Sequence, residues 1–261
     1  MTTLLSDTWF VAQRELIKFF RGKIRVIITL IQPVIWLGLM GNMMRGLTNN
    51  PMAAQAFGTG NYLTFMTPGI ILMTVLFGGV FGGVSIVWDR RIGYLEKLLA
   101  APIHRGAIPF GKTLAMMIQG AIQVIAIMVI ATLMGVRFAS GFGGILYILF
   151  LAMLFSGILS SLTLSLAASI KTMETLMAIV NLLTLPLMFT SNALFPTSVM
   201  PSWLAAIARI NPVTYAVGPI RELTISGWHW DKILPGTLVV FGLVVVFMLG
   251  SQVVFGHATT E

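Results

Sequence analysis

Six long stretches without a charged residue divide the chain, and each is between 19 and 43 residues long. A helix needs about 20 apolar residues to cross the hydrocarbon core of a bilayer. Breaks inside the longer stretches, such as Thr48-Asn-Asn-Pro51 and Asn192 to Pro196, limit where these helices fit. The pattern predicts six membrane-spanning helices, at 26–44, 62–87, 110–136, 143–169, 172–193 and 234–256.

Glycine pairs in the second predicted span indicate how it packs. Gly78-Gly79 and Gly82-Gly83 form two overlapping G-x-x-x-G patterns. Small residues at this spacing let two helix backbones approach closely in a membrane. We therefore expect the second span to pack tightly against another helix.

The residues before the first span have an amphipathic pattern. Between residues 5 and 25, basic side chains recur at helical spacing along one stripe and apolar side chains along the opposite one. The basic stripe contains Arg14, Lys18, Arg21 and Arg25, and the apolar stripe contains Trp9, Ala12, Leu16 and Phe20. Such a pairing is typical of a helix at the headgroup boundary. We expect an interfacial helix here, the alternative being a basic flank that only sets the topology.

A second amphipathic segment, residues 88–102, joins the second span to the third. Ile92, Leu95 and Leu99 recur at i, i+3 and i+7, which predicts a short helix. Charged residues surround this stripe, and Pro102 ends the pattern. The segment is too short and too charged to span a membrane, yet one face is apolar. It either lies on lipid or docks into a groove on a partner.

Prolines at 196, 201 and 212 punctuate the region between the fifth and sixth spans. Met200–Ile210 has the composition of about three apolar helical turns, with its only charge at Arg209. We expect a re-entrant hairpin in the outer leaflet, with a short helix held against spans five and six. An ordinary interfacial helix is the alternative. The residues assigned to this outer gate are Pro196, Pro201, Trp203, Leu204, Asn211 and Pro212.

Composition narrows the class of protein. Apolar residues make up 57% of the 261 residues, charged residues only 9%, and the mean hydropathy is +0.94. An ordinary soluble domain has roughly 25% charged residues, so soluble enzymes and nucleic-acid-binding modules are nearly excluded. The chain has no cysteine, and its three histidines lack metal-ligand spacing. We expect an integral membrane protein without a catalytic or metal site.

The net charge of +8 fits basic residues that face anionic lipid. With both termini inside, eleven lysine and arginine residues lie in the inner segments and five in the outer ones. The positive-inside rule therefore predicts cytoplasmic termini. We expect one transmembrane domain in the inner (plasma) membrane, with an interfacial helix at 1–25, the six-span bundle at 26–256 and a cytoplasmic tail at 257–261.

One motif suggests nucleotide binding. Gly106-Ala-Ile-Pro-Phe-Gly-Lys-Thr113 matches the phosphate-loop pattern G-x-x-x-x-G-K-[ST]. That motif works in a loop between a strand and a helix, where backbone N–H groups face the phosphates. Here an amphipathic helical segment precedes it, Pro109 removes one N–H, and an apolar span follows directly. We interpret Lys112 as a cytoplasmic anchor of the third span and expect no nucleotide binding.

Two segments resemble the signatures of ABC type-2 transporter permeases. Trp88-Asp-Arg-Arg-Ile-Gly-Tyr-Leu-Glu-Lys-Leu-Leu-Ala-Ala-Pro102 is similar to the family pattern W-x-R-x-x-G-x-L-E-x-L-x-x-x-P between spans two and three. Leu185–Pro196, followed by Met200-Pro-Ser-Trp203 and Asn211-Pro-Val-Thr-Tyr215, is similar to the second signature. Asn192 stands where many relatives have glycine. The resemblance extends over the whole chain and is strongest to drug- and lipooligosaccharide-export permeases, including the daunorubicin-resistance type.

The resemblance implies an all-helical half-channel that dimerises and associates with two copies of a separate ATPase, which uses ATP and Mg. It implies that the interfacial helix, with Trp9, Arg14, Lys18 and Arg21, and the loop helix after span two contact the ATPase. The implied coupling residues are Asp89, Arg90, Arg91, Gly93, Leu95, Glu96, Lys97 and Leu98. The expected function is export of a hydrophobic or amphiphilic substrate, such as a drug, a lipid or a lipid-linked glycan.

Two other function classes are weaker. A secondary transporter or channel without ATP coupling is the main alternative. However, coupling to an ion gradient needs ionisable groups inside the membrane, and no carboxylate lies deep within a predicted span. A membrane-embedded enzyme would need a nucleophile with a base, or metal ligands, near one membrane face. His104 and His229 are predicted on opposite faces.

Overall fold

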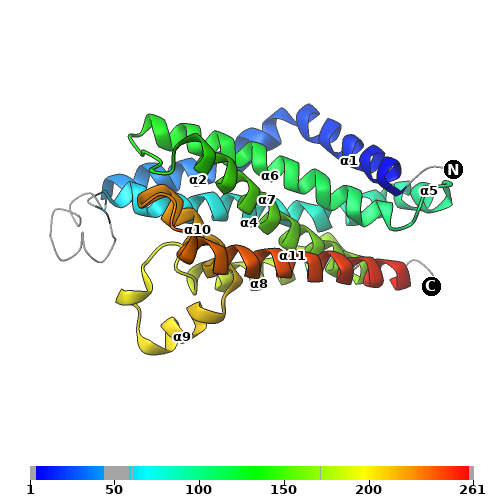
Figure 1. Ribbon diagram of the computed structural model, residues 1–261. Helices are drawn as coiled ribbons and strands as arrows, with labels where there is room; N and C mark the ends of the chain where they lie inside the picture. The colour runs from blue at the N-terminus through cyan, green and yellow to red at the C-terminus, as the bar shows by residue number, and fades with distance from the viewer. Residues whose placement is uncertain (1–3, 44–58, 60, 171, 259–261) are drawn as a thin grey trace.

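The computed structural model describes residues 4–43, 59, 61–170 and 172–258, and every regular element in these residues is a helix (Figure 1). The elements are α1 (Leu4–Arg21), α2 (Lys23–Met43), α4 (Tyr62–Arg91), α5 (Tyr94–Ala100), α6 (Ala107–Leu133), α7 (Gly141–Ser169), α8 (Met173–Phe189), η2 (Thr197–Val199), α9 (Ser202–Ile210), α10 (Pro212–Ile225) and α11 (Trp230–Ala258).

Four helices among the described residues are long and apolar enough to cross a membrane: α4, α6, α7 and α11. A fifth candidate arises if α1 and α2, which meet at a bend of 71°, form one broken span. The apolar α8 has 17 residues and is shorter than a typical span. The structure therefore contains four to five candidate spans, and α2 and α8 occupy the places of the first and fifth predicted helices.

α4 packs tightly against α7, as the glycine pattern predicted. The Thr163 hydroxyl donates to the Gly79 carbonyl oxygen at 3.1 Å, and the Gly83 N–H donates to that hydroxyl at 3.2 Å. A Cβ atom on Gly83 would overlap the Thr163 carbonyl group. The predicted close approach is confirmed, and α7 is the partner helix.

The start of α1, the whole of α5 and the end of α11 lie together at one end of the bundle, at the right of Figure 1. We call this the termini end. The opposite end contains α10 and the turn between α6 and α7. Both described ends of the chain thus lie on one side of the bundle, as an even number of spans requires.

The region between α8 and α11 differs from the prediction. A helix does form at α9, but its main contacts are with η2 and α10, and Trp203 is 64% exposed. The expectation that this helix lies against spans five and six is wrong. The helix that packs against the bundle is α10, which contacts α4, α7 and α11. The reason is that Asn211-Pro212 ends one helix and begins another, whose buried stripe includes Val217 and Ile220.

Candidate functional site

The predicted coupling segment consists of two helices joined by a tight turn. α4 continues through Arg91, and Gly93 then adopts a left-handed conformation with φ of 68° before α5 begins. The expected helical stripe that started at Ile92 is therefore wrong, because Ile92 lies in the turn and is 56% exposed. Leu95 is the member of the stripe that is buried, in the cluster with Ile86 and Ile108.

The eight predicted coupling residues differ in how deeply the structure buries them. Asp89 and Leu95 are buried, whereas Arg91, Glu96 and Lys97 are exposed, with Arg90, Gly93 and Leu98 between these extremes. The Arg90 guanidinium donates to the carbonyl oxygens of Ala168 and Ile170 at 3.0 and 3.1 Å, so it caps the end of α7. Asp89 and Arg90 thus serve contacts within the chain, and Arg91, Glu96 and Lys97 lie on its surface.

Asp89 belongs to a buried group of charged side chains between α1, α4 and α6. The Lys112 ammonium donates to Asp89 at 2.6 Å and to Glu15 at 3.0 Å. The exposed fractions of Lys112 and Asp89 are 0%, and that of Glu15 is 4%. The Ser85 hydroxyl accepts from Lys112 at 2.6 Å and donates to Glu15 at 3.0 Å. With Arg14 and Lys18, these three charged residues form what we call the ion cluster.

Arg14 connects the ion cluster to α5. Its guanidinium donates to both carboxylate oxygens of Asp89, at 3.1 and 3.2 Å, and lies 3.5 Å from the centre of the Tyr94 ring. Near the start of the same helix, the Asp7 carboxylate accepts from the His104 N–H at 3.0 Å. α1 is therefore attached both to the end of α4 and to α5 with its following loop.

The orientation of α1 differs from the simple amphipathic prediction. Arg14 and Lys18 turn toward the protein, whereas Trp9 and Phe20 of the apolar stripe are 51% and 58% exposed, and Arg21 is also exposed. The physical reason is the buried Asp89, because a desolvated carboxylate needs cations around it. Trp9 and Phe20 are consequently left on the outer surface of α1, whereas Ala12 of the same stripe is buried.

The ion cluster combines two acidic side chains with three basic ones. Burial alone raises the pKa of the Glu15 carboxyl, but the nearby Lys112 and Lys18 ammonium groups outweigh this effect and hold that pKa below its ordinary value. Three cations then face two carboxylates, which gives the ion cluster a net charge of +1.

Lys112, which we interpreted from the sequence as a cytoplasmic anchor of the third span, is buried. The residues of the phosphate-loop pattern from Ala107 onward are helical, and the ammonium group of Lys112 is enclosed by protein carboxylates. Sequence reasoning missed this cluster. The available signal was three residues, Glu15, Asp89 and Lys112, each at the same predicted depth beside an apolar helix.

The predicted outer-gate residues are separated into two groups. Asn211 is 4% exposed and begins α10: its side chain accepts from the Val213 N–H and donates to the Leu187 carbonyl oxygen at 2.8 Å. Pro212 occupies the first turn of α10, where its missing N–H costs nothing. Trp203 and Leu204 lie on α9, and Pro196 and Pro201 directly precede η2 and α9, so all four are separate from this cap.

Arg221 stabilises the segment between α8 and η2, which we call the corner. This residue was not singled out from the sequence. Its guanidinium donates to the carbonyl oxygens of Asn192 at 2.7 Å, Ala193 at 3.1 Å and Phe65 at 3.4 Å. It also lies 4.1 Å from the centre of the Phe65 ring. The signal for it was a lone cation within the apolar stripe of α10.

The fold and these two polar centres define a multi-pass helical membrane protein whose first helix is attached to a short loop helix. The chain belongs to the ABC-2 type transporter family, whose model matches residues 6–224. It is 33% identical to the putative transport permease ycf38 of Cyanophora paradoxa, over 88% of this chain and 78% of that protein. It is 25% identical to the daunorubicin resistance ABC transporter permease protein DrrB1 of Streptomyces coeruleorubidus, over 94% of this chain and 84% of that protein. It is 21% identical to the probable doxorubicin resistance ABC transporter permease protein DrrC of Mycobacterium tuberculosis, over 98% of this chain and 91% of that protein.

Proposed function

We propose that this chain is the membrane subunit of an ATP-driven exporter that moves a hydrophobic or amphiphilic substrate, such as a drug, a lipid or a lipid-linked glycan, out of the cytoplasm or inner leaflet. The family match over residues 6–224 carries this proposal. The drug-resistance names of two relatives support the substrate class. In this proposal ATP and Mg are used by a separate ATPase subunit, and two copies of the chain form the pathway.

The proposed topology has six spans, namely α2, α4, α6, α7, α8 and α11, within one domain of the plasma membrane. The termini end would face the cytoplasm. Support comes from the uneven distribution of basic residues, because Arg91, Lys97 and Arg105 are all at the termini end. α1 would then lie at the inner surface, and α9 would lie in the outer leaflet as part of the exit gate.

α5 is proposed to receive the motion of the ATPase. It exposes Glu96 and Lys97 at the termini end, where a cytoplasmic partner can reach them. Its other contacts are internal: Tyr94 lies against Arg14, and Leu95 is buried. A displacement of α5 by the ATPase would therefore be transmitted to both α1 and α4.

The decisive test is purification of the chain from its native membrane, followed by reconstitution into vesicles. We expect an ATP-hydrolysing subunit to co-purify in equal amount, and transport of a lipophilic dye to require ATP. Transport that stops on collapse of an ion gradient, and continues without ATP, would instead establish the secondary-transporter alternative.

Glu96→Ala combined with Lys97→Ala should lower substrate-stimulated ATP hydrolysis about tenfold, the effect of losing roughly 1.4 kcal/mol of contact energy. The chain should still insert and keep its thermal stability, because both side chains are exposed. Asp231→Ala combined with Lys232→Ala removes the same charges at the opposite end and should have no effect. An assembled Glu96/Lys97 variant with the wild-type transport rate would contradict the role of α5.

The purified chain without its ATPase should bind no ATP. The reason is that Lys112, the only lysine of the phosphate-loop pattern, is enclosed by Glu15 and Asp89. Equilibrium dialysis with labelled ATP and Mg measures this directly. Saturable binding that disappears in Lys112→Ala would show that the pattern is functional.

Single cysteines along 202–210 test whether α9 enters the outer leaflet. In this cysteine-free chain, an impermeant thiol reagent applied from outside should label Ser202→Cys and Arg209→Cys rapidly. It should label Trp203→Cys and Ile210→Cys at least about tenfold more slowly, because hydrocarbon excludes the reagent. Equal, rapid labelling at all nine positions would mean that α9 is a solvated helix.

A further inference from the structure

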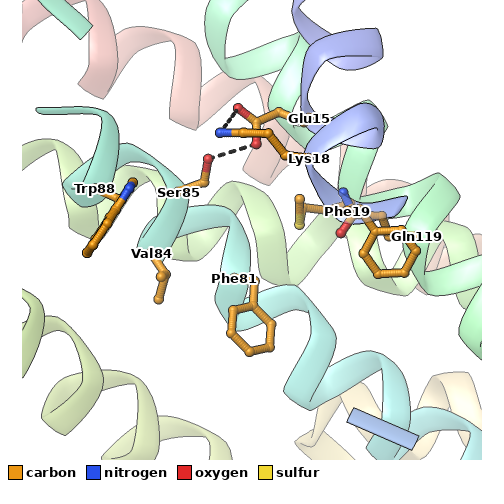
Figure 2. A pocket seen from close by; sticks show the side chains of 9 residues that line it. Glu15, Lys18, Phe19, Phe81, Val84, Ser85, Trp88 and Gln119 are labelled. Carbon is orange, nitrogen blue, oxygen red and sulfur yellow. Dashed lines mark hydrogen bonds and ion pairs between the residues drawn. The ribbon is translucent and has the colours of Figure 1, made fainter. Parts of the chain in front are cut away.

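A cavity of about 290 Å³ opens beside the ion cluster, between α1, α4 and α6 (Figure 2). Figure 2 shows that Glu15 and Lys18 lie at one end and Phe81 at the other. The complete lining is Glu15, Lys18, Phe19, Phe81, Val84, Ser85, Trp88, Met116 and Gln119. A charged end and an aromatic end within one cavity are the two features that an amphiphile requires.

The charged end favours an anion. Both carboxylate oxygens of Glu15 already accept: one from Arg14, Lys18 and Lys112, the other from Ser85. Lys18 differs from the enclosed Lys112, since its side chain is 39% exposed and has one short contact, to Glu15 at 2.8 Å, and one long contact, to Asp89 at 3.5 Å. A third N–H of Lys18 remains for a ligand, and the net charge of +1 attracts a negative one.

Two further donors line the cavity. The Trp88 side chain is 51% exposed, and its indole N–H has no hydrogen-bond partner among the described residues. The Gln119 side chain is 9% exposed and likewise has no partner in that part of the chain. The Gln119 carboxamide is not one of the fully enclosed polar groups without a partner and lines the cavity, so its N–H groups are available to donate to ester or hydroxyl oxygens of a ligand.

The apolar end extends away from the termini end. Trp88 and Phe81 are two turns apart on α4, so the cavity extends over about 10 Å along the helix at 1.5 Å per residue. Phe19, Phe81, Met116 and Gln119 also line a second, narrower space that continues to Gln123. This depth matches the distance from a lipid phosphate to the upper acyl chain.

We infer that this cavity binds an anionic phospholipid of the leaflet at the termini end. The phosphate group contacts Lys18 and Trp88, the glycerol ester oxygens contact Gln119, and an acyl chain lies against Phe19 and Phe81. Lipid binding at this cavity does not require an ATPase, so the inference can fail or hold independently of the proposed function. Occupancy of the cavity would hold α1 against α4, because the lining belongs to both helices.

A single cysteine at Val84, which lines the middle of the cavity, tests the inference in the purified, delipidated chain. We expect phosphatidylglycerol to slow the reaction of Val84→Cys with a small thiol reagent about tenfold. Phosphatidylcholine with the same acyl chains, and inorganic phosphate alone, should slow it little. Val129→Cys, on the outer face of α6 and 54% exposed, is the control. It should react with the thiol reagent at the same rate whichever lipid is present.

Variants of the headgroup contacts make the test specific. Lys18→Gln should weaken the protection of Val84→Cys by phosphatidylglycerol about tenfold, as expected for a charge-assisted hydrogen bond. Arg21→Gln removes the same charge from an exposed position one turn away and should change nothing. Trp88→Phe, at an exposed residue whose replacement leaves the core intact, should weaken protection about threefold even if Lys18→Gln fails to fold.

Four outcomes would overturn the inference. Equal protection by phosphatidylcholine would mean that the cavity takes acyl chains without regard to the headgroup. Equal protection by inorganic phosphate would mean that it takes a free anion. No protection by any lipid, or full protection in both Lys18→Gln and Trp88→Phe, would mean that no headgroup is bound at this place.

Discussion

Asp89→Asn should lower the free energy of unfolding by about 3–5 kcal/mol, the usual cost of removing one partner from a buried ion pair. In the variant, Lys112 has an exposed fraction of 0% and retains a single carboxylate partner, Glu15. Arg14 also loses one of its two acceptors on residue 89, because the amide nitrogen of asparagine donates and cannot accept. Thermal unfolding in detergent, followed by tryptophan fluorescence, measures the change.

Glu96→Gln is the matched control, because it removes a carboxylate from the neighbouring helix at an exposed position. It should change the unfolding temperature little. Lys112→Met should be less harmful than Asp89→Asn, since Arg14 and Lys18 still balance the two carboxylates. If Asp89→Asn unfolds at the wild-type temperature, the ion cluster does not stabilise the termini end.

Arg221→Met should release the corner between α8 and η2. Three carbonyl oxygens, those of Asn192, Ala193 and Phe65, lose their donor. An unsatisfied buried acceptor costs about 1–3 kcal/mol, so we expect a loss of roughly 3 kcal/mol or more. A cysteine placed at Leu194, which is 6% exposed, should react with thiol reagents at least about tenfold faster in this variant.

Two further variants separate charge from geometry at this corner. Arg221→Lys keeps the cation but cannot span three acceptors with a planar fork, so its effect should be intermediate. Arg209→Met removes an exposed arginine from α9 and should leave the Leu194→Cys reactivity unchanged. Wild-type reactivity in Arg221→Met would show that Asn211 alone holds the corner.

The predictable part of the fold was the part encoded by local pattern. Charge-free stretches located α2, α4, α6, α7, α8 and α11 to within a few positions, and the glycine pairs predicted that α4 packs closely against another helix, which is α7. The ends were less accurate. α4 extends past Val87 to Arg91 because a helix can carry charged residues beyond the apolar segment.

The two polar centres could not be predicted from local pattern. Glu15, Asp89 and Lys112 meet only because α1, α4 and α6 have a particular rotation about their axes, which spacing within one helix does not fix. α10 was missed for a different reason. Pro219, Arg221 and Glu222 interrupt its apolar stripe, so residues 212–225 lacked the continuous pattern of the other helices.

The order of the ion cluster along the chain has a consequence for biosynthesis. Its two carboxylates are made first, at Glu15 and Asp89, and the cation that is enclosed between them follows only with α6. Until Lys112 leaves the ribosome, only Arg14 and Lys18 can balance these two charges. Burial of Glu15 on α1 and Asp89 on α4 is therefore less favourable before α6 is made. α6 therefore completes a folding unit, and we expect α1 of a nascent chain that ends before residue 112 to stay accessible to added protease.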